Sequence, residues 1–166
     1  MKVIAIVDKK WGIGKNNDLL FSIKEDMRHF MKHTLGKVVV MGRNTLLSFP
    51  GGKPLKNRVN IVLWPDGEKR DDCIIVESLE ELLVLLKNYP TDDVFIIGGA
   101  MFYRTMLPYC GTALITKVEA DGGAEVFFEN LDELENWKLI SKEPPIEADG
   151  YIIAFTEYKN LSPKPY

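Results

Sequence analysis

A series of short apolar runs is the feature that most constrains what this chain can fold into. A strand with one solvated face shows a polar residue at every second position, so runs without that alternation predict strands buried on both faces. Val3–Val7 and Lys37–Met41 are the clearest examples, because they consist mostly of β-branched and long aliphatic residues. The expected strands of this series are residues 3–7, 37–41, 60–64, 73–76, 93–97 and 113–119.

Helical patterns separate most of these runs. Gly36 is expected to end the first helix, and Ser78 with Glu81 forms a capping-box pattern at the start of another. The expected helices are residues 24–35, 43–48, 79–86 and 100–107. Two further runs near the C-terminus, residues 137–141 and 151–156, have no helix between them. We therefore predict a single α/β domain, residues 1–166, with a mostly parallel mixed β-sheet of about eight strands, helices on both faces and an antiparallel C-terminal hairpin.

Composition excludes several classes of partner. The 21 basic and 24 acidic side chains give a net charge of -3, which offers no electrostatic case for nucleic acid or an anionic membrane as the main partner. No targeting segment is visible, and the longest uncharged run, residues 94–103, is about half of a membrane span. Cys73 and Cys110 match no metal or redox spacing. We expect a cytoplasmic protein that acts on a small molecule.

Glycine follows three of the expected strands. Ligands bind outside the carboxyl ends of strands in parallel sheets, and glycine allows backbone amides to approach a phosphate. The three positions are Gly12 with Gly14, the segment Gly42–Thr45 and the segment Gly98–Ala100. They favour a dinucleotide, although glycines can also simply end strands. No G-x-G-x-x-G follows the first strand, so an ordinary Rossmann site is not predicted.

The first helix carries the candidate acid. Its expected apolar face is Ile23, Met27, Phe30, Met31 and Thr34, and Asp26 lies on the border of that face. Asp26 is therefore either a solvated residue or the acid of a pocket. His29 and His33 share its stripe, but their spacing matches no metal site, so we predict no bound metal and interpret them as surface residues on a solvated face. Arg58 is either a surface cation or a fork for a substrate carboxylate.

Taken together, these motifs resemble the dihydrofolate reductase family in order and spacing. The resemblance covers nearly the whole chain, and the segments that carry it are Gly12–Leu19, Asp26 with Phe30, Val40–Thr45, Pro54–Arg58, Ile96–Gly99 with Tyr103, and Thr116. It implies an oxidoreductase of one-carbon metabolism that reduces 7,8-dihydrofolate to tetrahydrofolate by hydride transfer from NADPH, with protonation at N5 assisted by Asp26. It also implies binding of antifolate inhibitors, and we expect a monomer.

The resemblance assigns roles residue by residue. The implied catalytic residues are Asp26, Thr116, Phe21 and Tyr103. The implied substrate-binding residues are Ile4, Ala5, Asp26, Met27, Phe30, Phe49, Leu55, Arg58, Ile97 and Thr116. The implied cofactor-binding residues are Ala5, Ile13, Gly14, Asp18, Leu19, Gly42, Arg43, Asn44, Thr45, Leu63, Trp64, Gly98, Gly99, Ala100, Met101 and Phe102. Residues 14–19 are expected to form a lid, with Gly12 and Gly14 as its hinges.

Three departures from the family pattern bear on function. Leu20-Phe21 stands where the family usually has Pro-Trp, and phenylalanine cannot donate a hydrogen bond to a water near the substrate. Trp64-Pro65 and Met101 stand where small hydroxylated or basic residues usually hold the 2′-phosphate of NADPH. Arg43 remains, with Lys69 and Arg70 as substitutes on the following loop. The preference for NADPH over NADH therefore stays open.

Two alternative functions are also open at this point. A pyrimidine reductase of riboflavin synthesis shares the fold, but it should lack both the Asp26–Phe30 pair and the Leu55-x-x-Arg58 motif. A non-catalytic pterin- or nucleotide-binding module is suggested only by Leu20-Phe21.

Overall fold

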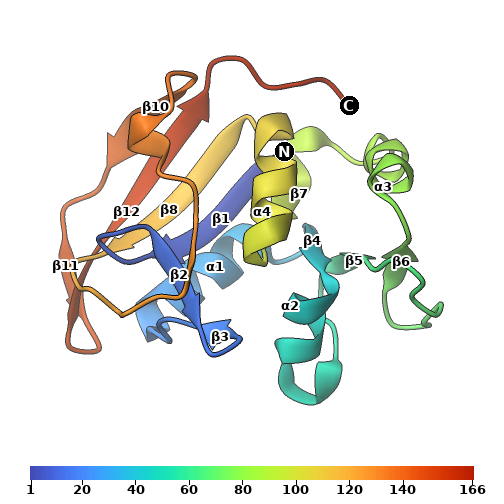
Figure 1. Cartoon of the computed structure of the whole chain (residues 1–166), viewed down its shortest axis with the longest axis horizontal. Coiled ribbons are helices and arrows are strands. Elements are labelled where there is room, and N and C mark those ends of the chain that lie inside the picture. Colours follow the sequence, from blue (N-terminus) through green and yellow to red (C-terminus); the bar gives the residue numbers. More distant parts are fainter.

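The computed structural model describes all residues from Met1 to Tyr166, and one large mixed sheet dominates it (Figure 1). Eight of its strands follow the order β10-β12-β8-β1-β7-β4-β5-β6, and β11 pairs with β12. The strands from β8 to β6 in this order are parallel, whereas β12 runs antiparallel to β8, β10 and β11. Their bounds are β1 Lys2–Val7, β4 Val38–Gly42, β5 Val59–Leu63, β6 Ile74–Val76, β7 Val94–Ile96, β8 Thr112–Val118, β10 Trp137–Lys142, β11 Ile146–Ala148 and β12 Tyr151–Asn160. The predicted fold class is confirmed.

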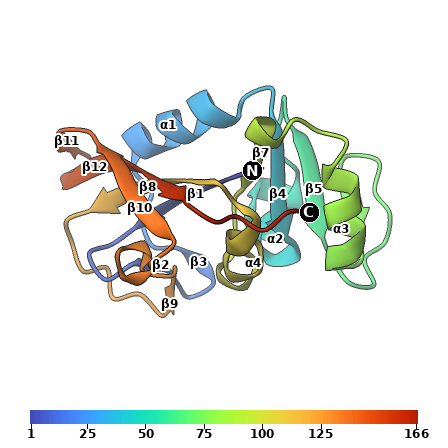
Figure 2. The same ribbon diagram turned by 90° about the horizontal axis from the view of Figure 1, so that it is seen from above.

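Helices cover both faces of this sheet. They are α1 Lys24–Thr34, α2 Arg43–Ser48, α3 Leu79–Leu86 and α4 Ala100–Met106, with short 3-10 turns η1 Pro50–Gly52, η2 Thr91–Asp93, η3 Leu107–Tyr109 and η4 Leu131–Glu133. Seen along the sheet, α1 lies on one side and α4 on the other (Figure 2). None of the helices is long and apolar enough to cross a bilayer.

Strand alternation divides the interior into two main cores. On β4, Val38 and Val40 belong to the core that includes α3 and α4, whereas Val39 and Met41 belong to the core that includes Leu46 of α2. All four side chains are at most 4% exposed, as expected for a strand whose successive side chains enter opposite cores. Each such side chain contributes on the order of 1.5–3 kcal/mol through burial. The apolar runs of the sequence therefore identify the strands correctly.

The predicted loop over residues 12–19 is instead a small β-hairpin. Its strands are β2 Gly12–Lys15 and β3 Asp18–Leu19, and β2 also pairs with β9, Val126–Phe127. Asn16 and Asn17 form the turn with φ of 53° and 59°. Positive φ at both central residues is the conformation of a two-residue hairpin turn, and asparagine tolerates it better than most residues. The loop prediction was wrong because this turn chemistry was overlooked.

The histidines of α1 also differ from the prediction. The His29 ring stacks on Phe155 of β12, with ring centroids 4.1 Å apart, and His33 meets the His29 ring at 4.5 Å. Burial lowers the pKa of His29 to about 4, so this ring is neutral at physiological pH. Met31, predicted on the inner face, is instead 52% exposed. The face of α1 that meets the sheet is therefore rotated toward the histidines.

Gly12 is required by close packing and not by its backbone conformation, because its φ is not positive. A Cβ atom at this position would lie 2.3 Å from the Cβ of Ala124 and 2.9 Å from a carboxylate oxygen of Asp8. Glycine here lets β2 and the segment before β9 approach one another closely. The prediction of Gly12 and Gly14 as hinges remains a prediction.

We expect Gly12→Ala to lower the free energy of unfolding by about 1–3 kcal/mol, the usual cost of overpacking. Gly111→Ala is the matched control, because a Cβ atom there meets nothing within 4 Å. Urea unfolding followed by circular dichroism measures both changes. Equal unfolding midpoints for the two variants would contradict the close approach seen at Gly12.

Candidate active site

The candidate site begins where α1 meets β8. Asp26 lies in the first turn of α1, and Thr116 is 1% exposed in the middle of β8. Burial raises the pKa of the Asp26 carboxyl, and the Thr116 hydroxyl, which can donate to that carboxylate, lowers it in part. A carboxyl group whose pKa is raised by burial beside one hydroxyl holds a proton more readily than an exposed carboxyl does, which is a property of groups that take part in proton transfer.

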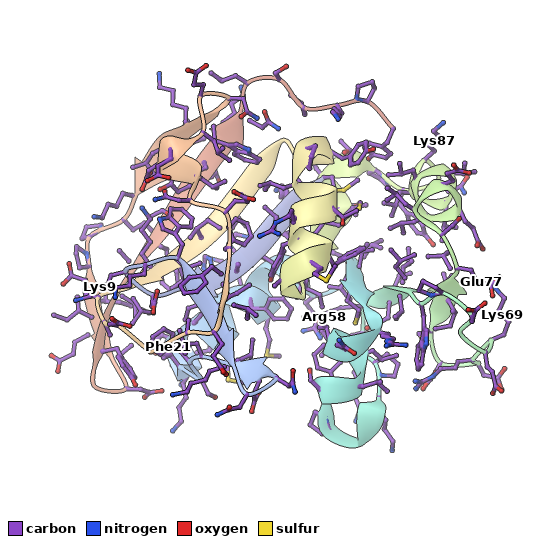
Figure 3. All side chains as sticks on the ribbon, in the orientation of Figure 1. Lys9, Phe21, Arg58, Lys69, Glu77 and Lys87 are labelled. Carbon is purple, nitrogen blue, oxygen red and sulfur yellow. The ribbon has the colours of Figure 1, made fainter.

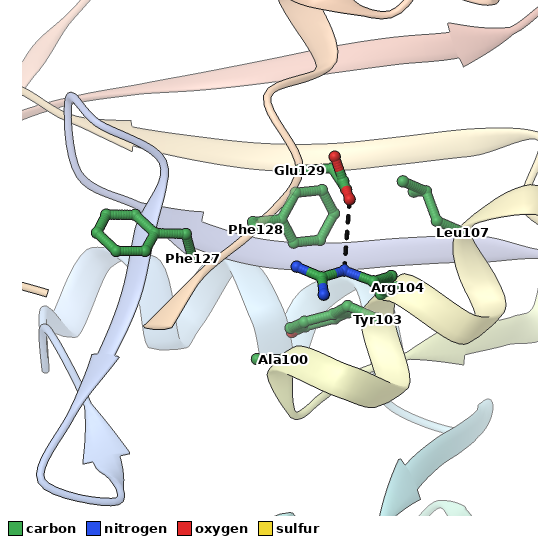
Figure 4. Close-up of a pocket in the computed structure, with 7 residues that line it drawn as sticks. All are labelled: Ala100, Tyr103, Arg104, Leu107, Phe127, Phe128 and Glu129. Atoms are coloured by element: carbon green, nitrogen blue, oxygen red, sulfur yellow. Dashed lines mark ion pairs between the residues drawn. The ribbon is translucent and has the colours of Figure 1, made fainter. Parts of the chain in front are cut away.

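Tyr103, on α4, lies on the side of the sheet opposite to α1 and contacts β1 from there. Its hydroxyl donates to the Ile4 carbonyl at 2.8 Å, and its ring meets Phe128 edge-on at 5.1 Å between centroids. Burial, and to a smaller extent the charge of Asp26, raise the pKa of Tyr103, so it stays protonated. Figure 4 shows the ion pair of Arg104 and Glu129, 3.4 Å between Nε and Oε1, that closes the crevice beside these rings. Tyr103 therefore fixes the position of the β1 backbone.

Arg58 lies at the other end of α1. Its guanidinium carbon is 5.7 Å from the centroid of the Phe30 ring, and its Nε is buried without a hydrogen-bond partner. Burial lowers the pKa of this guanidinium, and no carboxylate of the chain pairs with it. A buried cationic donor without a partner is costly unless a ligand completes it, and a carboxylate is the ligand that fits a guanidinium best.

The glycine turns after β4 and β7 are joined directly. The Gly42 amide donates to the Gly98 carbonyl at 2.8 Å, and the peptide bond between Gly98 and Gly99 is cis. Gly98 has φ of 127°, and a Cβ atom there would lie 3.3 Å from the Thr45 hydroxyl oxygen. The carboxyl ends of β4 and β7 thus form one compact surface, in which the backbone of Gly98 requires glycine, next to the exposed side chain of Arg43.

A protein-family model described as dihydrofolate reductase matches residues 1–160. The chain belongs to the dihydrofolate reductase family. The relatives include the dihydrofolate reductase of Bacillus subtilis (strain 168), 38% identical, with 94% of this chain and 92% of the relative covered. The enzyme of Staphylococcus haemolyticus is 32% identical, with 97% and 96% covered. A solved dihydrofolate reductase of Enterococcus faecalis, complexed with NADP(H) and RAB-propyl, matches the fold with a TM-score of 0.84 at 24% identity, covering 96% and 95%.

Membership of the dihydrofolate reductase family confirms the predicted recognition and the predicted enzyme class. It also excludes the alternative function, a pyrimidine reductase of riboflavin synthesis. The structure lets us locate each residue to which the resemblance gave a role.

The predicted substrate-binding residues lie along the α1 and α2 side of the sheet. Phe30, Phe49, Leu55 and Ile97 pack against the smaller main core, to which the buried Ile4 also belongs. Met27 is 55% exposed beside them, and Ala5 of β1 packs against the larger core. Asp26 and Thr116 are linked through the carboxyl of Asp26, and Arg58 lies against the Phe30 ring, so α1 contributes to both groups of predicted substrate residues.

The predicted cofactor residues gather at the carboxyl ends of β4, β5 and β7 and on the β2–β3 hairpin. Leu63, Ala100 and Phe102 pack in the larger core, and Trp64 packs against the smaller one. Leu19 and Met101 are 70% and 83% exposed, and the Asp18 carboxylate accepts from the Leu19 amide at 2.7 Å. Of the remaining members, Ile13 and Gly14 lie within β2, Gly42 ends β4, Arg43, Asn44 and Thr45 form the first turn of α2, and Gly98 and Gly99 lie between β7 and α4.

Phe21 is the predicted catalytic residue that the structure places in an apolar setting. It is 6% exposed and belongs to a third core with Ile23, Val118, Ala148 and Ile153, where its ring meets Tyr151 edge-on at 5.2 Å. A ring with no polar atom in such a setting can shape the site but cannot transfer a proton.

Two polar residues that support the site were not predicted. The buried Asn60 accepts from the Leu55 amide at 3.0 Å and donates to the carbonyls of Leu55 and Arg58 at 2.8 and 3.1 Å. The buried Asp8 accepts from the amides of Lys10, Gly12 and Gly122 at 2.9, 2.7 and 3.0 Å. A polar residue inside or directly after an apolar strand is the sequence signal that identifies both.

The raised pKa of Asp26 has a consequence for stability. Because the folded state favours the protonated carboxyl, the stability of the protein falls as the pH rises from the ordinary value of 3.8 through the raised value. We expect Asp26→Asn to unfold at a higher urea concentration than wild type at pH 7, with the difference disappearing near pH 3.8. Asp71→Asn, at an exposed position, is the control. A lower midpoint for Asp26→Asn at pH 7 would refute this expectation.

Proposed function

We propose that this chain reduces 7,8-dihydrofolate to tetrahydrofolate with NADPH, and that protonation of the substrate depends on Asp26. The observation that carries the proposal is the half-buried Asp26 carboxyl between α1 and β8, with its pKa raised by burial and Thr116 beside it. Family membership supports the reaction, and the Enterococcus faecalis relative is described as complexed with NADP(H). NADPH, when bound, supplies the hydride.

The role of Asp26 follows from its surroundings. Its carboxylate pairs with the polar edge of the pterin and favours the protonated imine electrostatically. Thr116 orients the carboxylate by donating to it, which makes Thr116 a positioning residue. Phe21 cannot hold a water, so the proton reaches N5 from solvent that enters beside Asp26 rather than through a water fixed by this side chain.

The rest of the substrate is held along α1. Phe30 and Phe49 offer apolar surface for the benzoyl ring, and the Arg58 guanidinium receives a carboxylate of the glutamate. Its buried Nε, which has no partner within the chain, supports this role. Antifolates that share these groups bind the same cleft.

The β2–β3 hairpin acts as the lid over the reacting atoms. Its Asn16 amide donates to a carboxylate oxygen of Glu125 at 2.7 Å, and the Glu125 amide donates to the Gly14 carbonyl at 2.8 Å. A hairpin held by these contacts and by the pairing of β2 with β9 excludes water when it covers the cofactor, and it opens only when the Glu125 contacts break.

The Gly98–Gly99 turn and the segment Gly42–Thr45 hold the cofactor phosphates. Their glycine backbone lets a phosphate approach closely, and Arg43 adds a cation that no acidic side chain of the chain pairs with. We also propose that the protein works as a monomer in the cytoplasm, where its two free cysteines, Cys73 and Cys110, stay reduced.

The test of this function follows the absorbance of NADPH in the presence of dihydrofolate. Oxidation that requires both compounds is the expected result, and binding without oxidation would identify a non-catalytic module instead. We expect Asp26→Asn to lose about 10²–10⁴-fold in turnover at neutral pH, the usual contribution of acid–base catalysis. Activity should recover in part on acidification, as the substrate becomes protonated in solution. Full activity of Asp26→Asn at pH 7 would remove this residue from the mechanism.

We expect Arg58→Leu to weaken dihydrofolate binding by about tenfold to a hundredfold, because a charged hydrogen bond contributes ~1.5–3 kcal/mol. Affinity for NADPH and for a pterin without the glutamate should stay unchanged. Lys56→Leu, which removes a neighbouring exposed cation, is the control. Fluorescence titration measures each dissociation constant. Equal weakening of the substrate and the cofactor would argue against a carboxylate site at Arg58.

A further inference from the structure

The strand order of the sheet shows which strand ends are neighbours along the proposed cofactor site. Thr116, on β8, lies beside β1, and β7 with its Gly98 turn comes next, followed by β4 with Gly42. Gly42 is in register with Leu63 of β5, and Leu63 is in register with Val76 of β6. A dinucleotide that reaches from Asp26 across the two glycine turns therefore meets the residues after Leu63 and Val76 at its far end. These residues are Trp64 and Glu77.

The charges at this far end are mixed. Arg43 is exposed at the start of α2 and forms no ion pair, whereas Glu77 is exposed at the end of β6 (Figure 3). The Glu77 amide is held by a carboxylate oxygen of Glu81 at 3.0 Å, which brings a second negative charge next to the first. An arginine pairs with the 2′-phosphate of NADPH, whereas a carboxylate repels it and accepts a hydrogen bond from the 2′-hydroxyl of NADH.

The other cations of this region are already engaged. Arg70 donates to both carboxylate oxygens of Asp72 at 2.8 Å and to the Gly52 carbonyl at 3.0 Å. The Lys69 ammonium donates to the Ile75 carbonyl at 3.1 Å. Neither of these two expected substitutes is therefore free to bind a phosphate without giving up a contact. Arg43 is the one cation here whose side chain has no hydrogen bond or ion pair.

Trp64 is fixed where a hydroxyl or a basic side chain would be needed for a phosphate. Its amide donates to the Val76 carbonyl at 2.8 Å, and its carbonyl accepts from the Gly67 amide at 2.9 Å. A Cβ atom on Gly67 would lie 2.7 Å from Cγ of Trp64, so the turn folds closely against the indole. The indole offers an apolar ring surface to the adenine and no group that contributes positive charge.

Resting on the proposed function, we propose that Arg43 and Glu77 read the 2′ position of the adenosine ribose with opposing preferences, and that the enzyme uses NADH as well as NADPH. Arg43 attracts the 2′-phosphate, and Glu77 offsets that attraction while favouring the free hydroxyl. Both residues are specificity determinants for the cofactor and take no part in the chemistry at the pterin.

The first test compares kcat/KM for NADPH and NADH with saturating dihydrofolate at one ionic strength. The expected ratio is below about tenfold, which corresponds to ~1.4 kcal/mol. A larger ratio in favour of NADPH overturns the inference while leaving the reductase function intact. Absence of oxidation with both cofactors would instead remove the proposed function itself, so the two failures are distinguishable.

The second test assigns the effect to residues and does not depend on turnover. Titration calorimetry gives the affinities of NADP⁺ and NAD⁺ for wild type and variants. Glu77→Lys should raise the preference for NADP⁺ at least about tenfold, and Arg43→Gln should lower the affinity for NADP⁺ at least about tenfold more than the affinity for NAD⁺, because only NADP⁺ carries the 2′-phosphate. Glu80→Gln, an exposed acid in the first turn of α3, is the control and should change neither. Equal effects of Glu77→Lys and Glu80→Gln on the two nucleotides would overturn the role of Glu77.

Discussion

Burial of both faces of the parallel strands is the constraint on which the rest of this structure depends. Val38 to Met41 alternate between two cores and leave no room for a polar side chain within β4. Most polar groups of the proposed site therefore stand at strand ends or come from elements that pack on the sheet, and Thr116, within β8, is the exception. Arg43 and Glu77 follow strand ends, and Asp26 comes from the first turn of α1. The site is thus assembled where the apolar pattern stops.

Asp26 and Arg58, at the two ends of the proposed substrate site, are both destabilised in their charged forms. Burial disfavours the charged form of Asp26, whose pKa rises, and of Arg58, whose pKa falls. Each group would be more stable if a ligand supplied the missing partner, a polar pterin edge for Asp26 and a carboxylate for Arg58. Asn60 shows how the second position is maintained, because its three hydrogen bonds hold the loop that carries Arg58. The structure without a ligand is therefore less stable than it would be without these two groups.

The sequence allows most strands of the main sheet, the four α-helices and the order of the motifs to be predicted, because each depends on local periodicity or on a turn residue, whereas the short strands β2, β3, β9 and β11 were missed. Asp26 and Thr116 could be paired only through a family resemblance, since 90 positions of chain separate them. Periodicity misassigned His29, because its contact with Phe155 belongs to the tertiary packing of α1 against β12. Asp8 and Asn60 were missed for a different reason: each is a polar residue at or within an apolar strand, but its partners are backbone amides and carbonyls, which no side-chain motif indicates.

Leu20-Phe21, which stand where the family usually has Pro-Trp, make apolar contacts at the base of the β2–β3 hairpin. Leu20 packs closely over Gly122, where a Cβ atom would lie 2.6 Å from its Cγ, and the buried Asp8 binds the Gly122 amide at 3.0 Å. Phe21 is in turn packed against Tyr151 at the start of β12. The pair therefore anchors the base of the β2–β3 hairpin to two separate segments through apolar contact. Phe21 offers no hydrogen-bond donor, but its apolar contacts fix the base of the hairpin that we propose as the lid, so under this proposal solvent reaches Asp26 when the hairpin opens.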